Sequence, residues 1–181
     1  MNTYQLSLSL SLKEIRKLHV GDIIFLSGKL FTARDEAHQQ LLDIPIEKVP
    51  FDIDSLGLYH CGPLMKKKES EWQVIAAGPT TSSRLELFEA DLIKKFPSIN
   101  VIIGKGGMGN NTLNALRNHG IYLSYTGGAA ALAADQILKV EDVFWLDKLG
   151  MAEAVWVFSV DSFGPLIVGI DAHGKSLFQT K

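Results

Sequence analysis

The sequence predicts a mixed α/β domain, with alternating strands and helices in the middle and β structure toward both ends. In the middle, the apolar runs at residues 74–77 and 101–103 each break into a polar turn, and a helical pattern follows each turn. Near the N-terminus, leucines alternate with serines at the period of a strand. Short apolar runs separated by glycine-containing turns fill the last forty or so residues. Such alternation favours a mixed sheet covered by helices.

The N-terminal part is predicted to be mainly β structure. The alternating leucines from Leu6 to Leu12 predict a strand that must stop early. It stops because Ser11-Leu12-Lys13-Glu14 fits a capping box, which would open a short helix ending near Leu18. Residues 23–26 and 30–32 are then expected to be two strands separated by a glycine break.

Arg34 lies at a predicted junction between a strand and a helix. The helix would run from there to about residue 42, with Asp35 as its N-terminal cap. Residues 43–57 carry two prolines and several acids, so we expect a loop followed by a short strand. Lys66-Lys67-Lys68 is interpreted as a solvated turn. Residues 72–77 are expected to form a buried strand.

The second half alternates helices and strands. Leu85, Phe88, Leu92 and Phe96 keep helical spacing and predict an amphipathic helix that Pro97 ends. A helix around residues 113–117 would end at Gly120, and a helix of small residues would open near residue 129. Strands are expected at residues 121–125, 143–146, 154–160 and 166–170, with Gly164-Pro165 as a turn.

Composition excludes several classes of protein. The 181 residues suffice for one domain with a substantial core. The formal net charge of −2 gives no global positive field for nucleic acid or an anionic membrane. No apolar stretch reaches membrane-spanning length, and no secretory signal is visible. Cys61 is the single cysteine, so it can neither form an internal disulfide nor hold an iron–sulfur cluster alone, and we expect a cytoplasmic protein.

The two polar turns in the middle of the chain predict an anion site. One turn covers residues 78–84 and the other covers residues 104–111. Each would expose backbone N–H groups at the start of a helix, where the helix dipole also favours negative charge. Each also carries one cation, Arg84 in the first turn and Lys105 in the second.

Two alternatives stay open for these turns. The segment from Gly104 to Gly109 fits the bare G-x-G-x-x-G pattern of dinucleotide sites, but no acidic residue ends the next strand. A glycine-rich turn that allows positive φ is therefore favoured. Thr80 and Arg84 are four residues apart and would share one helix face, an arrangement that suits a carboxylate substrate. A capping turn with Arg84 in a surface ion pair has about equal weight.

The remaining chemically active side chains favour structural roles. His60 lies at a strand end, but a satisfied structural histidine is the favoured interpretation. His38 and His119 are expected on helix surfaces, and His173 in a turn. Cys61 is interpreted as a small buried residue rather than a nucleophile.

Six segments carry a family resemblance, and they follow one another in order along nearly the whole chain. They are Thr32-Ala33-Arg34-Asp35, Gly78-Pro79-Thr80-Thr81-Ser82-x-Arg84, Gly104-Lys105-Gly106-Gly107-Met108-Gly109, Gly127-Gly128-Ala129-Ala130, Leu149-Gly150-Met151-x-Glu153-Ala154-x-Trp156 and Phe163-Gly164-Pro165-Leu166-Ile167-Val168. Together they resemble the β region of the iron–sulfur hydro-lyases, the family of class I fumarate hydratase and L-tartrate dehydratase. Leu85 and Ala152 depart from the expected methionine and proline, but neither stands at a proposed substrate ligand.

The resemblance implies a fold, an activity and a partner. It implies a single swivelling β/β/α domain over residues 1–181 that works as a β subunit. The implied reaction is reversible hydration of a small dicarboxylate, first of all fumarate to (S)-malate. An L-tartrate dehydratase β subunit that forms oxaloacetate is the alternative, and a non-catalytic anion-binding or assembly module is a third hypothesis. The implied [4Fe–4S] cluster is held by three cysteines of a partner α subunit, in a probable α2β2 assembly.

The resemblance also implies roles for individual residues. Arg34, Arg84 and Lys105 would bind the substrate carboxylates, together with Thr81, and no residue of this chain would bind metal. Thr80 matches the proposed catalytic base of the family. A threonine hydroxyl is a poor base at its ordinary pKa, so a partner carboxylate from the α subunit would have to activate it.

Overall fold

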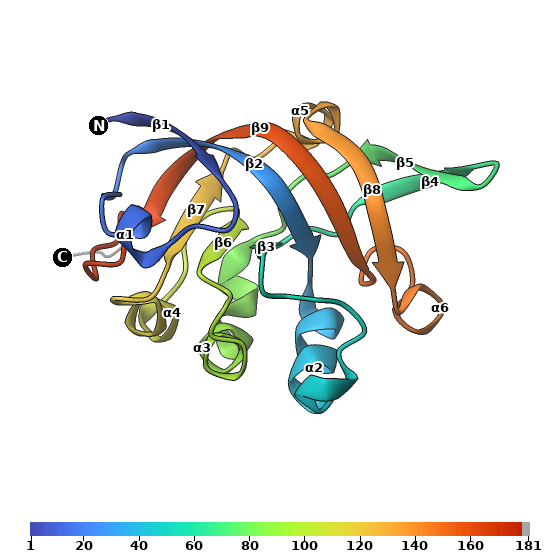
Figure 1. The fold of residues 1–181 in the computed structure, drawn as a ribbon, viewed down its shortest axis with the longest axis horizontal. Helices are drawn as coiled ribbons and strands as arrows, with labels where there is room; N and C mark the ends of the chain where they lie inside the picture. Colours follow the sequence, from blue (N-terminus) through green and yellow to red (C-terminus); the bar gives the residue numbers. More distant parts are fainter. Residues whose placement is uncertain (179–181) are drawn as a thin grey trace.

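The computed structural model describes residues 1–178 and shows a curved sheet with helices packed along one side (Figure 1). Within these residues, seven strands form one sheet in the order β1-β2-β3-β6-β7-β9-β8, and β4 pairs with β5 in a separate hairpin. The strands β1, β2, β3, β6 and β7 run parallel to one another. The strand β9 is antiparallel to β2, β7 and β8, with which it pairs. The predicted mixed α/β fold with a mixed sheet is therefore confirmed.

The elements are short except for two long strands. In chain order they are β1 Thr3–Ser7, α1 Leu12–Ile15, β2 Ile23–Thr32, α2 Asp35–Asp43, η1 Ile46–Lys48, β3 Leu56–Tyr59, β4 Leu64–Lys68, β5 Glu71–Ala76, η2 Ser82–Leu85, α3 Glu86–Lys95, β6 Val101–Gly104, α4 Asn110–Leu116, β7 Ile121–Tyr125, α5 Ala130–Asp135, β8 Ile137–Phe144, α6 Leu146–Leu149 and β9 Val155–Ile170. None of the helices between residues 1 and 178 has the length and apolar character needed to cross a membrane.

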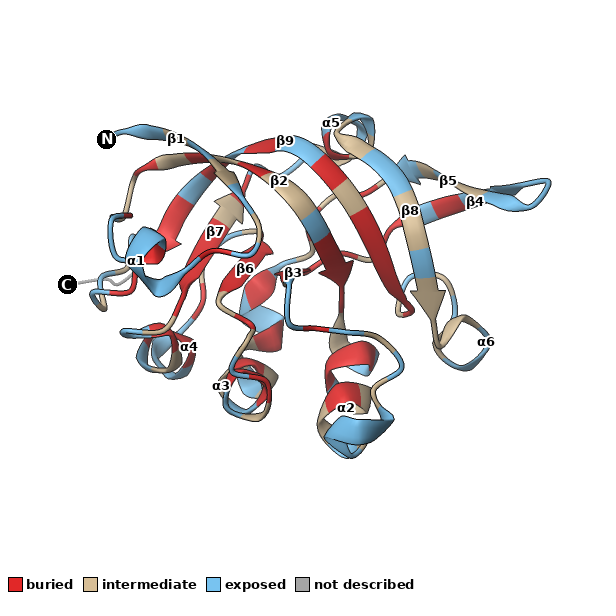
Figure 2. Cartoon of the chain, in the orientation of Figure 1, coloured by how far each residue is buried: buried red, intermediate tan, exposed pale blue. Residues whose placement is uncertain are grey.

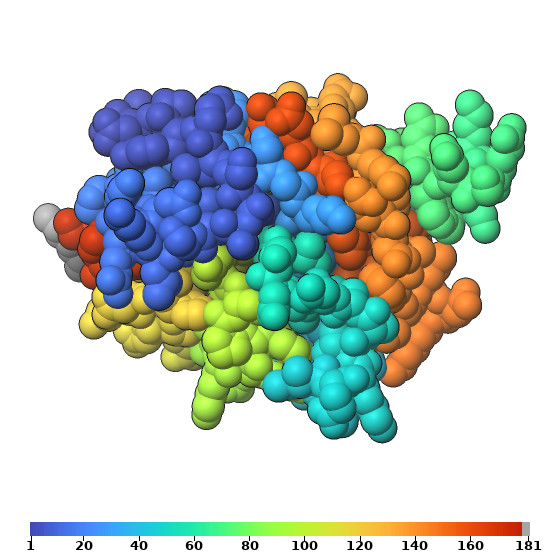
Figure 3. All heavy atoms as spheres, in the orientation of Figure 1, coloured from blue at the N-terminus to red at the C-terminus, as the bar shows by residue number. Residues whose placement is uncertain are grey.

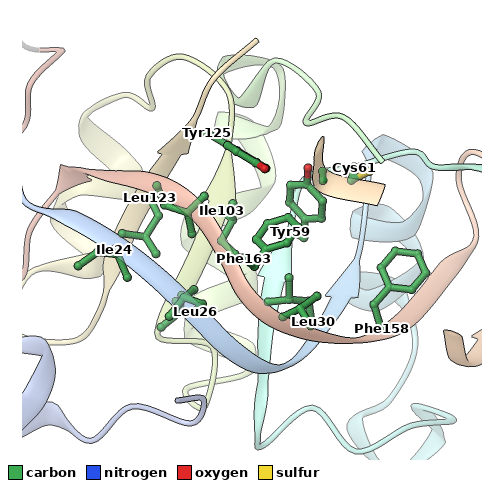
Figure 4. Packing of buried hydrophobic residues seen from close by; sticks show 14 of the residues in the cluster. Ile24, Leu26, Leu30, Tyr59, Cys61, Ile103, Leu123, Tyr125, Phe158 and Phe163 are labelled. Carbon is green, nitrogen blue, oxygen red and sulfur yellow. The ribbon is translucent and has the colours of Figure 1, made fainter. Parts of the chain in front are cut away.

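The long strand β9 curls the sheet back on itself. One of its edges pairs with β2 along most of its length. Its other edge pairs with β8 through its first half and with β7 through its last residues. Because β2 and β7 lie on opposite sides of β9, the strands β2, β3, β6, β7 and β9 enclose a partial barrel. Side chains such as Leu30, Ile103 and Phe163 fill its interior (Figure 4).

The central parallel strands β3, β6 and β7 bury both faces, as their apolar runs predict. Successive residues point to opposite faces, so Tyr59 and Ile103 pack inside the barrel while their neighbours Leu58 and Ile102 face the helices. The helices α2, α3 and α4 lie side by side over that second face (Figure 1). Their buried sides are red in Figure 2, and their outer surfaces are exposed. The helix-covered face therefore forms a second hydrophobic core.

Several predicted boundaries are wrong, and bulges explain the largest errors. Residues 23–26 and 30–32 belong to one strand, β2, because a register shift near Gly28 bends the strand without ending it. Similarly, Gly164-Pro165 is not a turn but lies within β9. The predicted strand at residues 143–146 begins earlier, at Ile137, and Leu146 already opens α6.

The N-terminal helix begins as predicted but ends early. Ser11 and Glu14 form the reciprocal capping box, with Ser11 N–H donating to Glu14 Oε2 at 2.8 Å. The helix α1 ends at Ile15 rather than near Leu18, and the preceding strand β1 is confined to Thr3–Ser7.

The lysine-rich segment is a strand rather than a turn. Lys66, Lys67 and Lys68 lie in β4, which forms a hairpin with β5 that projects from the body of the molecule (Figures 1 and 3). The strand β5 is half-exposed instead of buried, because only alternate residues such as Trp72 face the protein. The Trp72 ring packs edge-on against Trp156, with 5.0 Å between their centroids. The Trp72 ring therefore holds the hairpin against the body of the protein close to its turn, while residues 66–71 are exposed.

Candidate active site

The candidate site lies where three parallel strands end. Arg34 follows β2, His60 follows β3 and Lys105 follows β6. Carboxyl ends of parallel strands meet at one edge of a sheet, which is where α/β proteins commonly bind ligands. The turn after β5 is laid across this edge by two isolated bridges, one between Cys61 and Pro79 and one between Thr81 and Lys105. The structure thus brings the segments that carry all five predicted site residues to one edge.

Arg34 and Arg84 share one acidic neighbour, Asp35. The Arg84 Nη2 atom lies 3.3 Å from Asp35 Oδ2 and 3.4 Å from Oδ1. The Arg34 Nη2 atom lies 3.7 Å from the same Oδ2. Two guanidinium groups thus lie around this one carboxylate. Since the Arg84 side chain is 57% exposed, it is free to leave Asp35 for a ligand at small cost.

A distant glutamate holds the start of α2 in place. Arg34, not Asp35, is the N-cap residue of α2, and it makes no side-chain capping bond. Instead Glu153 Oε2 accepts a hydrogen bond from the Glu36 N–H at 3.0 Å. The other oxygen, Glu153 Oε1, lies 3.3 Å from Arg34 Nε. The predicted cap was therefore wrong, and Glu153 positions both the helix and the guanidinium.

Thr80 and Thr81 lie in the turn before the short helix η2. The Thr80 N–H donates to the His60 carbonyl oxygen at 2.7 Å, and its side chain is half-buried. Because η2 begins at Ser82, Thr80 lies outside the helix, and the expectation that it shares a helix face with Arg84 is wrong. Thr81 is exposed and is the N-cap residue of η2. The turn presents both hydroxyl residues beside the end of β3.

Lys105 is fixed by its backbone. Its carbonyl oxygen accepts from the Ser82 N–H at 3.0 Å, and its own N–H donates to Ser82 Oγ at 3.1 Å. Its side chain runs past Gly127, where an added Cβ would lie 3.4 Å from Lys105 Cδ. The two predicted turns are therefore adjacent and hydrogen-bonded to each other.

The backbone N–H groups of Gly109, Asn111 and Thr112 at the start of α4 are not exposed to a ligand, contrary to the expectation. Glu86, the first residue of α3, already occupies the start of α4. Its carboxylate accepts hydrogen bonds from the backbone N–H groups of Gly109, Asn111 and Thr112 at 2.7–3.3 Å and from Thr112 Oγ1 at 2.7 Å. The helix N-terminus is thus satisfied within the protein. The groups of this edge that suit an anion are therefore the side chains of Arg34, Arg84 and Lys105.

Replacing Glu86 with alanine is expected to destabilise the protein. The substitution leaves several N–H groups at the start of α4 without their charged acceptor, which should lower the free energy of unfolding by roughly 2 kcal/mol. Urea denaturation of the full chain measures this difference. Glu47→Ala, at an exposed position of η1, is the matched control and should change little. Equal effects of the two substitutions would contradict the capping role.

A buried polar cluster beneath the turns was missed from the sequence. His38, His60, Ser82 and Glu89 are all fully buried. His38 was expected on a helix surface, but α2 buries it together with Ala37 and Leu41. Glu89 lies four residues after Leu85 and three before Leu92, on the apolar face of α3. That spacing was the available signal, since a glutamate on an apolar face needs a buried partner.

Similarity to a known protein family extends along the whole chain. A family model described as "Fumarase C-terminus" matches residues 1–181. The chain belongs to this family. The predicted resemblance to the β region of the hydro-lyases is thereby confirmed.

Relatives of this fumarase C-terminus domain carry two kinds of name. The chain is 46% identical over 173 residues to the "Putative L(+)-tartrate dehydratase subunit beta" of Methanocaldococcus jannaschii, covering 94% of this chain and 88% of the relative. It is 38% identical to the "L(+)-tartrate dehydratase subunit beta" of Escherichia coli K12, covering 91% and 81%. It is 45% identical to the "Putative fumarate hydratase class I" of Geobacillus stearothermophilus, covering 92% of this chain but 32% of that protein.

The residues of this fumarase C-terminus domain do not fit an iron–sulfur cluster of its own. Such clusters are held by several cysteine thiolates. Cys61 is the single cysteine of the sequence, and it is fully buried. Burial raises the pKa of its thiol well above the ordinary value, although the Arg34 charge opposes this effect. The domain offers cations and hydroxyl groups at its candidate site, but no set of cluster ligands.

Proposed function

We propose that this chain is the β subunit of a hydro-lyase that reversibly adds water to a small dicarboxylate, first of all fumarate to give (S)-malate. The observation that carries the proposal is the convergence of Arg34, Arg84 and Lys105 on the strand edge beside Thr80. Three cations suit two carboxylates, because each carboxylate gains a charged partner and one cation remains for charge that develops during the reaction.

The two arginines and the lysine would bind the substrate in different ways. Arginine binds a carboxylate through two parallel hydrogen bonds, so Arg34 and Arg84 would fix the orientation of the substrate as well as its charge. Asp35 occupies both guanidinium groups in the free chain and would yield Arg84 to the substrate. Lys105 acts as a point charge on a fixed backbone. Thr81, exposed in the same turn, would add a hydroxyl hydrogen bond.

Thr80 is the proposed proton acceptor at carbon. Its N–H bond to the His60 carbonyl fixes the backbone from which the hydroxyl projects. Hydration and dehydration need a group that takes and returns this proton. A neutral hydroxyl needs activation, and we propose that a carboxylate of the partner chain supplies it.

The partner would also supply the [4Fe–4S] cluster. When bound, that cluster contributes a Lewis-acidic iron for the hydroxyl group of the substrate. This chain has one buried cysteine, so the proposal assigns the three cluster cysteines to an α subunit. The printed names of two relatives, each a "subunit beta", support a heteromeric assembly, which we propose to be α2β2.

Tartrate is the second candidate substrate. The relatives at 46% and 38% identity carry tartrate dehydratase names, whereas the relative at 45% carries a fumarate hydratase name. Both substrates are four-carbon dicarboxylates, and the same three cations suit either one.

The test is a parallel assay of fumarate, malate and L-tartrate under strict anaerobiosis. It uses this chain with its α partner after reconstitution with iron and sulfide. A larger kcat/KM for fumarate and malate would support the first candidate, and a larger kcat/KM for tartrate would support the second. Turnover of none of them by an iron-loaded complex would overturn the proposed function.

A further inference from the structure

The buried cluster under the candidate site joins four separate segments. His38 comes from α2, His60 follows β3, Ser82 opens η2 and Glu89 comes from α3. The helices α2 and α3 are neighbours in the layer that covers the sheet (Figure 1). All four side chains are fully buried. Nothing in the proposed chemistry uses them, so their burial needs a separate reason.

One end of the cluster reaches Arg34. The Arg34 carbonyl oxygen accepts from the His38 N–H at 2.9 Å and lies 2.7 Å from His38 Nδ1. A carbonyl can only accept, so Nδ1 must carry a proton. The other ring nitrogen, Nε2, lies 3.5 Å from Glu89 Oε2. His38 thus links the backbone of a proposed carboxylate-binding residue to Glu89.

The other end reaches Thr80 and Lys105. Ser82 Oγ accepts from the Lys105 N–H at 3.1 Å and lies 3.0 Å from the Tyr122 hydroxyl oxygen, which is also 2.9 Å from the Gly106 carbonyl oxygen. The Ser82 hydroxyl is hydrogen-bonded to His60 Nδ1 at 2.9 Å. The other ring nitrogen, His60 Nε2, lies 3.0 Å from Glu89 Oε2. The His60 carbonyl oxygen meanwhile holds the Thr80 N–H.

Glu89 joins the two ends through charge. Its contacts to both imidazoles are ion-pair distances without hydrogen-bond alignment. Burial alone would raise the pKa of Glu89, but His60 and His38 outweigh it and lower that pKa below the ordinary value. Burial lowers the pKa of His60. An ionised Glu89 that faces both imidazoles therefore links the two ends of the cluster.

A metal ion fits the cluster poorly. His38, His60 and Glu89 place three possible ligand atoms within 4.8 Å of one another. Structural zinc sites use four protein ligands, and a divalent ion beside one carboxylate would leave a net positive charge in a fully buried position.

We propose that Glu89, acting through His38 and His60, is a positioning residue that fixes the spacing between Arg34 and the Thr80–Lys105 pair. This role rests on the proposed function, because the spacing matters only if these residues bind one substrate. The network contacts no substrate. It holds the two halves of the site through backbone groups, namely the Arg34 carbonyl, the Thr80 N–H and the Lys105 N–H.

The test compares Glu89→Gln with Asp91→Asn in the reconstituted complex. Glu89→Gln keeps the shape and removes the charge, whereas Asp91 is exposed on the same helix and serves as the matched control. We expect Glu89→Gln to raise KM for the dicarboxylate at least tenfold with a smaller change in kcat. Glu89→Asp should restore part of the loss. Unchanged KM and kcat, or equal effects of the two amide substitutions, would overturn the proposal.

A double-mutant cycle separates positioning from general destabilisation. Ser82→Ala and Glu89→Gln should each raise KM, and their combination should raise it by clearly less than the product of the two factors. Effects that multiply independently would contradict a single network. Tyr122→Phe is the milder second variant if Ser82→Ala does not fold, because it removes the hydroxyl that lies 3.0 Å from Ser82 Oγ.

Nuclear magnetic resonance of the full chain tests the network without any activity. The nitrogen shifts of His38 should show a proton on Nδ1, the nitrogen that faces the Arg34 carbonyl oxygen. Glu89→Gln should change the His38 pattern and speed hydrogen exchange at the Lys105 amide, whereas Asp91→Asn should not. Unaltered signals, or stoichiometric zinc in the purified protein, would overturn the network even if the complex hydrates a dicarboxylate. The expected signals without any turnover would instead count against the proposed function alone.

Discussion

Replacing Thr80 with valine in the assembled enzyme is expected to lower kcat by roughly 100- to 10,000-fold, the usual contribution of a general base. Valine has nearly the shape of threonine but lacks the hydroxyl that would accept the proton. The backbone N–H of residue 80 still bonds to the His60 carbonyl, so the turn should keep its conformation. KM should change only a few-fold, because the carboxylate-binding cations are untouched. Steady-state kinetics with the preferred dicarboxylate measure both constants.

The control for this prediction lies in the same turn. Ser83 is exposed and has no proposed role, so Ser83→Ala should retain the kcat of the unmodified complex. Co-purification with the α partner shows that assembly survives in both variants. A Thr80→Val complex with normal kcat would remove Thr80 from the catalytic assignment and leave it a structural residue of the turn.

Replacing Arg84 with glutamine is expected to lower kcat/KM by roughly 10- to 150-fold, since a charged hydrogen bond contributes about 1.5–3 kcal/mol. The loss should appear mainly in KM, because a carboxylate is bound before and during the reaction. The Arg84→Lys complex should have a kcat/KM between those of the unmodified and the Arg84→Gln complexes, since lysine keeps the charge but not the paired hydrogen bonds. Kinetics of the three complexes give the order.

Stability should hardly change in the same variants. The Arg84 ion pair with Asp35 is exposed, and such pairs contribute at most about 1 kcal/mol. Arg16→Gln, an exposed arginine near the N-terminus, should alter neither stability nor kinetics. An Arg84→Gln complex with unchanged kcat/KM would support the alternative interpretation of Arg84 as a surface ion-pair residue.

The sequence predicts the local elements better than it predicts where a strand continues through a bulge. The alternation near Leu6 and the capping box at Ser11 depend on neighbouring residues, and both lie close to their expected places. The continuity of β2 and β9 depends on bulges, which a single chain segment does not reveal. A glycine that ends a strand and a glycine that bends one have the same local sequence.

In the candidate site, too, features set by neighbouring residues were predicted and features set by distant residues were not. Arg34, Arg84 and Lys105 stand out because each cation sits in or beside a predicted turn or strand end. Their partners come from distant segments, so the roles of Glu153 and Glu86 could not be assigned from spacing alone. The buried cluster was hidden for another reason: His38 and Glu89 interrupt apolar helix faces, and only the packing of α2 against α3 shows that they meet.

The most direct test of the account is a titration of a fixed amount of the iron-loaded α partner with this chain. Fumarate hydration and L-tartrate dehydration are followed under strict anaerobiosis. We expect no turnover by either chain alone. Activity with one of the two substrates should rise with added chain and saturate at one chain per partner. Full activity of the partner alone, or no activation by a chain that binds it, would contradict the claim that this domain supplies half of a dicarboxylate site.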